Sequence, residues 1–202
     1  MQWFVGYGSL VDEKSARKTC PNLQNFGYYW LEGYKRIFGI VAYRPVLQDP
    51  AILGRKELAA CYIVPEENAT PMFVCCFQIP ENDLAELKRR EFEYYEQNVE
   101  IRSAADQAVE KQATVFVGYG CDDLRDVGKG SDCVEKNQPD FYALYKGPYY
   151  RNDILPSDVY LRQCLDAYKC AGQDAYENFL DTSFLGNGSS LRSYVEMLNA
   201  QT

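Results

Sequence analysis

The sequence predicts a mixed α+β fold in which a curled, largely antiparallel sheet is accompanied by helices. Strand-like runs rich in Val, Ile, Phe and Tyr recur through the first 119 residues, bounded by Gly, Pro and Asn. The connections between them are mostly too short for repeated β–α–β units, and helical periodicity becomes frequent only later. The predicted strands are Trp3–Gly6, Arg36–Tyr43, Leu58–Val64, Met72–Ile79, Tyr95–Arg102 and Ala113–Tyr119.

Helices are predicted where apolar residues repeat every three or four positions after a start signal. Pro80 opens one helix. Pro156-Ser157 opens a second, with Leu161, Cys164, Leu165 and Tyr168 on one stripe. Helical register continues over Ala175–Phe184, and a terminal helix is expected at Leu191–Ala200. We therefore expect one domain over residues 1–185, then a flexible break and a C-terminal helix over 186–202, with Asp122–Pro139 a long surface loop.

Length and charge narrow the function classes. The 202 residues suffice for one domain with a core and a pocket. A formal net charge of -8 repels nucleic acid and anionic membrane surfaces, so neither is an expected partner. No apolar run is long enough for a membrane span, and the N-terminus lacks the basic region of a signal peptide. We therefore expect a cytoplasmic protein.

The chain contains no histidine, which excludes a Ser-His-Asp triad, a Cys-His pair and histidine-based metal sites. An enzyme with this composition must move protons with a carboxylate, a lysine, a tyrosine or a thiol. The eight cysteines form no C-x-x-C pair, which disfavours a structural zinc site or a thiol-redox enzyme. We expect all eight to be reduced in a cytosolic protein, and we expect no metal and no cofactor.

A glycine-rich turn follows the first predicted strand directly. Its two glycines allow the backbone to approach a ligand, and its N–H groups suit an anion or a carbonyl oxygen. Ser9 and Asp12 have the spacing of a capping box, so a helix is expected to start here. On spacing alone, a plain strand-to-helix turn is the better explanation. Phe4–Gly8 recurs identically as Phe116–Gly120, so these five letters alone do not specify a site. The candidate substrate-binding turn is Gly6-Tyr7-Gly8-Ser9-Leu10.

Glu91 is the candidate acid/base residue. Leu84, Leu87 and Glu91 share one helical face, whereas Glu86 and Glu93 fall on the opposite side. From Tyr95 the periodicity changes to two, which places Glu91 at a helix-to-strand corner pointing toward the core. Burial would raise its pKa and make it a better base near neutral pH. The alternative is a structural ion pair with Lys88, Arg89 or Arg90.

Three segments in order resemble the γ-glutamylcyclotransferase-like family, which includes the ChaC branch. Tyr7–Leu10 is similar to its glycine turn, Leu31–Arg36 to the segment that follows, and Leu87–Glu91 to its helix-end glutamate segment. The resemblance implies a small β-barrel with flanking helices. It also implies cyclisation of a γ-glutamyl amine or peptide to 5-oxoproline without metal or cofactor. The family's glutamate corresponds to Glu91 and its substrate-binding turn to Tyr7–Leu10.

The sequence departs from the ChaC branch after the turn, where Val11-Asp12-Glu13 replaces a usual tryptophan. Glutathione, γ-glutamyl amino acids and γ-glutamylamines therefore all remain candidate substrates. The alternative from another class is a catalytically inactive ligand-binding or interaction protein on the same fold. No oligomeric state is predicted.

Overall fold

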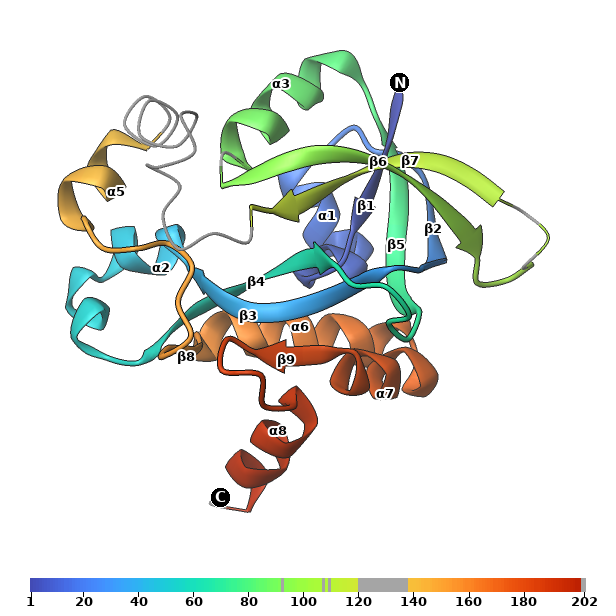
Figure 1. Ribbon diagram of the computed structural model, residues 1–202. Coiled ribbons are helices and arrows are strands. Elements are labelled where there is room, and N and C mark those ends of the chain that lie inside the picture. Colours follow the sequence, from blue (N-terminus) through green and yellow to red (C-terminus); the bar gives the residue numbers. More distant parts are fainter. Residues whose placement is uncertain (92, 107, 109, 120–137, 201–202) are drawn as a thin grey trace.

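The computed structural model describes residues 1–91, 93–106, 108, 110–119 and 138–200 (Figure 1). Two sheets and a set of flanking helices make up this part of the chain. The predicted α+β class is confirmed. Most of the loop predicted over Asp122–Pro139 lies outside the described residues, and so do Cys121 and Cys133.

The first sheet is a closed barrel, with its strands in the order β1-β5-β2-β6-β7. All neighbours in the barrel are antiparallel except β1 and β7, which pair in parallel and close it. Closure leaves no free edge among these strands. The largely antiparallel barrel that the family resemblance implied is therefore present. Its strands are β1 (Gln2–Gly6), β2 (Gln24–Leu31), β5 (Met72–Ile79), β6 (Tyr94–Ser103) and β7 (Glu110–Gly118).

The second sheet has four strands in the order β8-β4-β3-β9. Its two long central strands pair antiparallel, and a short strand pairs in parallel with each of them. This sheet continues from the barrel toward the helices at one end of the molecule (Figure 1). Its strands are β3 (Tyr34–Val41), β4 (Glu57–Pro65), β8 (Leu155–Pro156) and β9 (Ser183–Leu185).

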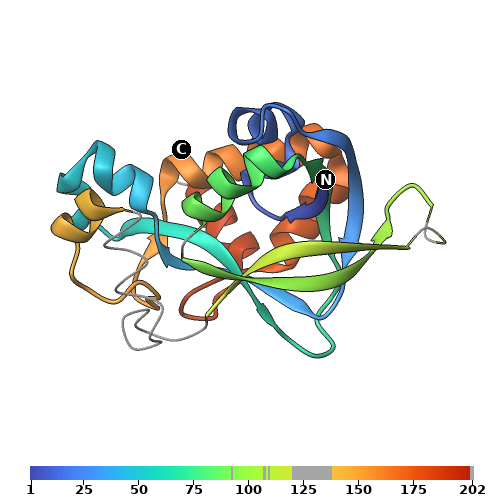
Figure 2. The same cartoon turned by 90° about the horizontal axis from the view of Figure 1, so that it is seen from above.

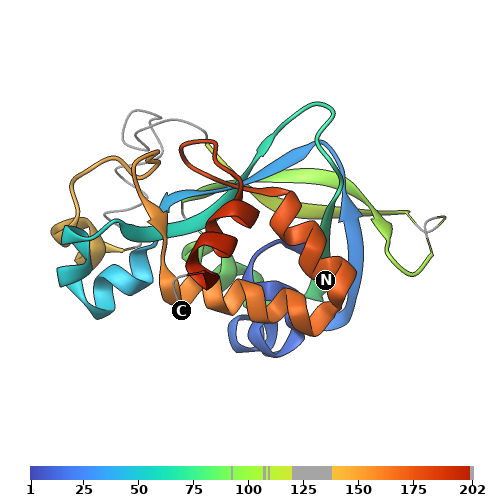
Figure 3. The same cartoon turned by 90° about the horizontal axis from the view of Figure 1, so that it is seen from below.

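Helices cover the strands from several sides. Figure 2 shows α3 alongside the long strands β6 and β7, and Figure 3, seen from below, shows α6, α7 and α8 together in front of the strands. The stripe predicted on the second helix is the packed face of α6, where Leu161, Cys164 and Tyr168 are buried. The helices are α1 (Glu13–Thr19), α2 (Tyr43–Gln48), α3 (Glu81–Arg90), α5 (Pro139–Leu144), α6 (Asp158–Ala171), α7 (Gln173–Asp181) and α8 (Leu191–Asn199), with short 3-10 turns at Ser9–Val11 and Pro50–Gly54.

Several strands differ from the sequence prediction, among them the short β8, which was not predicted. Strand β2 was not predicted, because a bulge between Gln24 and Gly27 interrupts its alternation. The strand predicted to reach Tyr43 ends at Val41, since α2 begins at Tyr43. The helix predicted over Ala175–Phe184 ends at Asp181, and the next residues form β9 instead. Parallel pairing with β3 overrides the helical pattern there.

The C-terminal helix packs against the rest of the chain. Leu191, Tyr194 and Val195 are buried in the main hydrophobic core. Arg192 binds Glu177 and Asp181 at the end of α7, with N···O distances of 2.7 and 2.6 Å. These ion pairs are exposed and contribute little individually, so the apolar face anchors α8. The separate flexibility of residues 186–190 stays a prediction.

Candidate active site

One small pocket lies between the turn that follows β1 and the corner that follows α3. Its volume is about 80 Å³. The predicted substrate turn and the predicted acid/base residue both line it, although about 80 residues separate them in the sequence. Its wall comprises Phe4, Val5, Gly6, Tyr7, Gly8, Ser9, Leu10, Cys61, Phe77, Leu87, Glu91, Tyr94, Phe116 and Tyr160.

The turn is fixed by the barrel on one side and a helix on the other. Strand β1 ends at Gly6, and a 3-10 turn starts at Ser9 without a side-chain cap. The predicted Ser9 cap is wrong. Asp12 is the N-cap of α1, and its carboxylate accepts the N–H groups of Lys14 and Ser15. Ser9 is thereby left on the pocket wall rather than committed to the helix.

The φ angle of Gly8 is -119°, which other residues also adopt. Glycine is required here because the side chain of Tyr160 approaches the turn closely. A Cβ atom at this position would collide with the hydroxyl of Tyr160 and lie 3.4 Å from the Cys61 sulfur. Tyr160 belongs to α6, so the missing side chain lets the turn and this helix share one pocket.

We expect Gly8→Ala to lower the free energy of unfolding by about 1–2 kcal/mol, the usual cost of overpacking. In a Tyr160→Phe background the same change should cost much less, because the hydroxyl that the new methyl group meets is gone. Urea unfolding of wild type, both single variants and the double variant gives the coupling energy. Additive costs would show that Tyr160 does not set the requirement for glycine.

A buried arginine supports the turn from behind. Arg36 on β3 is completely buried and donates to the Tyr168 hydroxyl at 2.7 Å and to Ser183 Oγ at 2.9 Å. Tyr168 Oη in turn lies 3.1 Å from the Tyr7 carbonyl oxygen and 3.0 Å from the Phe73 carbonyl oxygen, and its one proton is shared between these two acceptors. In the described part of the chain, Arg36 makes no ion pair with a carboxylate, and its Nε atom has no hydrogen-bond partner. Its positive charge therefore stays close to the pocket wall without a fixed counter-ion.

Glu91 sits at the corner that the sequence predicted. It is the C-cap of α3, with its N–H donating to the Leu87 carbonyl at 2.9 Å, and its own carbonyl accepts the Tyr94 N–H at 3.1 Å. Its side chain is half-buried and lines the pocket. Lys88, one of the ion-pair partners considered above, binds Glu96 instead, at 2.8 Å.

Glu93 was predicted on the solvent side, and that prediction is wrong. Only 4% of the residue is exposed, and its Oε1 atom has no partner among the described residues. The helical periodicity cannot be extended to Glu93, because α3 ends at Arg90 and the chain turns before β6 begins. Burial, and then the nearby charge of Glu91, raise the pKa of the Glu93 carboxyl well above its usual value.

Three pocket residues were missed by the sequence reasoning: Cys61 on β4, Tyr94 at the start of β6 and Tyr160 on α6. Tyr94 Oη donates to the Cys61 carbonyl at 3.2 Å, and Tyr160 Oη lies 3.2 Å from Cys61 Sγ. Burial raises the pKa of the hydroxyls of Tyr7, Tyr94 and Tyr160, so all three stay protonated donors at neutral pH. Within their own elements, Cys61, Tyr94 and Tyr160 follow ordinary core patterns, so no local signal in the sequence distinguishes them from other core residues.

The structure is that of an α+β protein built around a barrel, and Glu91 is the one carboxylate among the described residues that line the pocket. No family model matches the chain, and no curated protein matches it in sequence. Among solved structures, YkqA from Bacillus subtilis is similar with a TM-score of 0.51 and 13% identity, over 84% of this chain and 48% of that one. That similarity concerns the fold alone.

Structures of γ-glutamyl cyclotransferases are also similar to the chain. One such enzyme is similar with a TM-score of 0.48 and 12% identity, over 78% of this chain and 89% of that one. A γ-glutamyl cyclotransferase specific to glutathione from yeast has a TM-score of 0.44 and 15% identity, over 86% and 97% of the two chains.

Two properties of the described residues bear on other classes of protein. None of the helices there is both long enough and apolar enough to cross a membrane. In the same residues, no three side chains of His, Cys, Asp or Glu gather into a group able to hold a metal ion.

Proposed function

We propose that this protein is a γ-glutamylcyclotransferase-like enzyme of the cytoplasm, with Glu91 as its general acid/base. The observation that carries the proposal is the meeting of Glu91 and the Tyr7–Leu10 turn on one pocket wall. The reaction joins the α-amine of a γ-glutamyl group to its own γ-carbonyl carbon, closing the five-membered ring of 5-oxoproline and releasing the amine.

Both reacting groups belong to one molecule, so the pocket chiefly has to hold the folded conformer of the substrate. Glu91 takes a proton from the attacking α-amine and returns it to the leaving nitrogen. The backbone N–H groups of Tyr7–Leu10 hold the α-carboxylate or the developing oxyanion. The protonated hydroxyl of Tyr7, which lines the same pocket, is a further donor toward this anion.

The size of the pocket supports a compact ligand. Its volume of about 80 Å³ is far below the roughly 300–1,000 Å³ of sites for drug-sized ligands. Such a volume suits the γ-glutamyl end of a substrate, with the amine portion extending outward. The uncompensated charge of Arg36 favours an anionic group at this end.

The proposal predicts release of 5-oxoproline from at least one γ-glutamyl compound. We expect a panel of glutathione, γ-glutamyl amino acids and γ-glutamylamines to show turnover that depends on enzyme concentration, measured as 5-oxoproline by mass spectrometry. Binding of these compounds without product would support the alternative, an inactive ligand-binding protein. The absence of both binding and product for every compound in the panel would overturn the proposal.

A further inference from the structure

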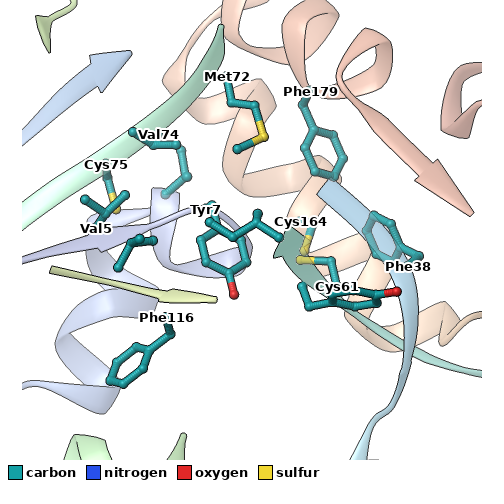
Figure 4. Close-up of a cluster of buried hydrophobic side chains, with 14 of the residues drawn as sticks. Val5, Tyr7, Phe38, Cys61, Met72, Val74, Cys75, Phe116, Cys164 and Phe179 are labelled. Atoms are coloured by element: carbon teal, nitrogen blue, oxygen red, sulfur yellow. The ribbon is translucent and has the colours of Figure 1, made fainter. Parts of the chain in front are cut away.

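A pair of cysteines lies beside the pocket and has no part in the proposed cyclisation. Cys61 lines the pocket from β4, and Cys164 belongs to α6. Figure 4 shows the two side chains next to each other, close to Tyr7. In the structure both are free thiols.

The positions of these thiols follow from how α6 meets β4. The Ser157 N–H, at the start of α6, donates to the Ala59 carbonyl on β4 at 2.8 Å. Tyr160 and Cys164 then stand four residues apart on one face of α6. Cys61 faces both, since its sulfur lies 3.2 Å from the Tyr160 hydroxyl and its side chain lies next to that of Cys164 in Figure 4.

Electrostatics distinguish Cys61 from the other buried thiols. Burial raises the pKa of Cys61, but the neighbouring Cys164 thiol, the charge of Arg36 and the Tyr160 hydroxyl outweigh it, and the pKa ends below its usual value. Burial raises the pKa of Cys75 well above its usual value. Of Cys61 and Cys75, Cys61 is therefore the residue in which the nucleophilic thiolate is favoured.

We propose that Cys61 is an oxidisable thiol of the pocket: a hydroperoxide entering the pocket oxidises its sulfur, and Cys164 then forms a disulfide with it. Hydrogen peroxide is scarcely larger than water, so a pocket of about 80 Å³ admits it. Because Cys61 shares this wall with Glu91, its oxidation state is expected to change the pocket that the proposed substrate occupies.

The chemistry is balanced with peroxide as the only oxidant. The Cys61 thiolate attacks one peroxide oxygen, the O–O bond breaks, and a sulfenic acid forms while the released hydroxide takes up a proton to become water. The Cys164 sulfur then attacks the Cys61 sulfur, the S–O bond breaks, and a second water leaves with the Cys164 proton. Two thiols lose two electrons, and one peroxide is reduced to two waters.

Peroxide treatment of the reduced full-length protein tests this, with thiol alkylation as quench and peptide mapping as readout. We expect Cys61 to be lost at least about tenfold faster than Cys75, since one pKa unit changes the thiolate fraction tenfold. A Cys61–Cys164 disulfide peptide should appear at the same rate. Exposed Cys170 is the internal control for accessibility alone.

Two variants separate the steps. In Cys164→Ser, the sulfenic acid of Cys61 should accumulate and be trapped by a 1,3-diketone; in Cys61→Ser, Cys164 should stay reduced. Circular dichroism and thermal unfolding check that each variant is folded. Oxidation of Cys170 while Cys61 and Cys164 remain thiols would overturn the proposal, as would a disulfide joining Cys61 to any other cysteine. These readouts are chemical, so they are independent of cyclotransferase activity.

Discussion

Glu91→Gln should lower the rate of 5-oxoproline release by at least about 10²-fold, the usual contribution of a positioned acid/base. The substitution keeps the size and most of the hydrogen-bonding capacity of the side chain but removes its ability to carry the proton. Because Glu91 is half-buried on the pocket wall, we expect the fold to survive and the thermal midpoint to change little. Turnover on the best γ-glutamyl substrate and thermal unfolding are the two measurements.

The control for this variant has to be chosen from the structure. Glu93 looked suitable by helical phase, but it is buried, and the charge of Glu91 acts on its carboxyl. Glu100 on β6 is exposed and accepts a hydrogen bond from Gln112 at 3.1 Å, so Glu100→Gln is the matched control. Equal turnover in Glu91→Gln and wild type would remove Glu91 from the mechanism. Loss of turnover in Glu93→Gln alone would move the acid/base role to that carboxyl.

Local patterns were sufficient for the elements that build the pocket wall. Strand Met72–Ile79 was predicted with its observed bounds, because seven of its eight residues are buried and apolar residues run through it. Glu91 could be placed because Leu84 and Leu87 define a helical face that still holds at the C-cap. The glycines of the turn could be recognised from their spacing after the first strand. These features depend only on neighbours along the chain.

The rest of the pocket depends on contacts between distant segments. Cys61 and Tyr160 meet only because α6 packs onto β4, and nothing in either segment indicates it. The burial of Arg36 is likewise set by Tyr168 and Ser183, more than 130 residues further along the chain. Three-dimensional packing therefore supplied the donors and the charge of the site, whereas the sequence predicted its candidate carboxylate.

The buried carboxyl of Glu93 makes a prediction about stability and pH. We expect Glu93→Gln to raise the free energy of unfolding by about 2 kcal/mol near pH 8, where a desolvated carboxylate is costly. Near pH 4.5 the two proteins should have nearly equal stability, because a protonated glutamic acid and a glutamine are both neutral and of similar size. Urea unfolding of both proteins at a series of pH values gives the difference.

The sign follows from proton binding. The pKa of Glu93 is raised in the folded state above the ordinary value of 4.5, so the folded protein holds this proton to higher pH than the unfolded chain does. As pH rises from about 4.5 to the folded pKa, the unfolded chain alone releases the proton, and wild type loses about 1.4 kcal/mol of stability per pH unit. Glutamine has no proton to release, so the variant escapes that loss. A difference independent of pH, or a destabilised variant at pH 8, would mean that Glu93 is charged and satisfied in the folded protein. Glu100→Gln, at an exposed position, should show no such dependence on pH.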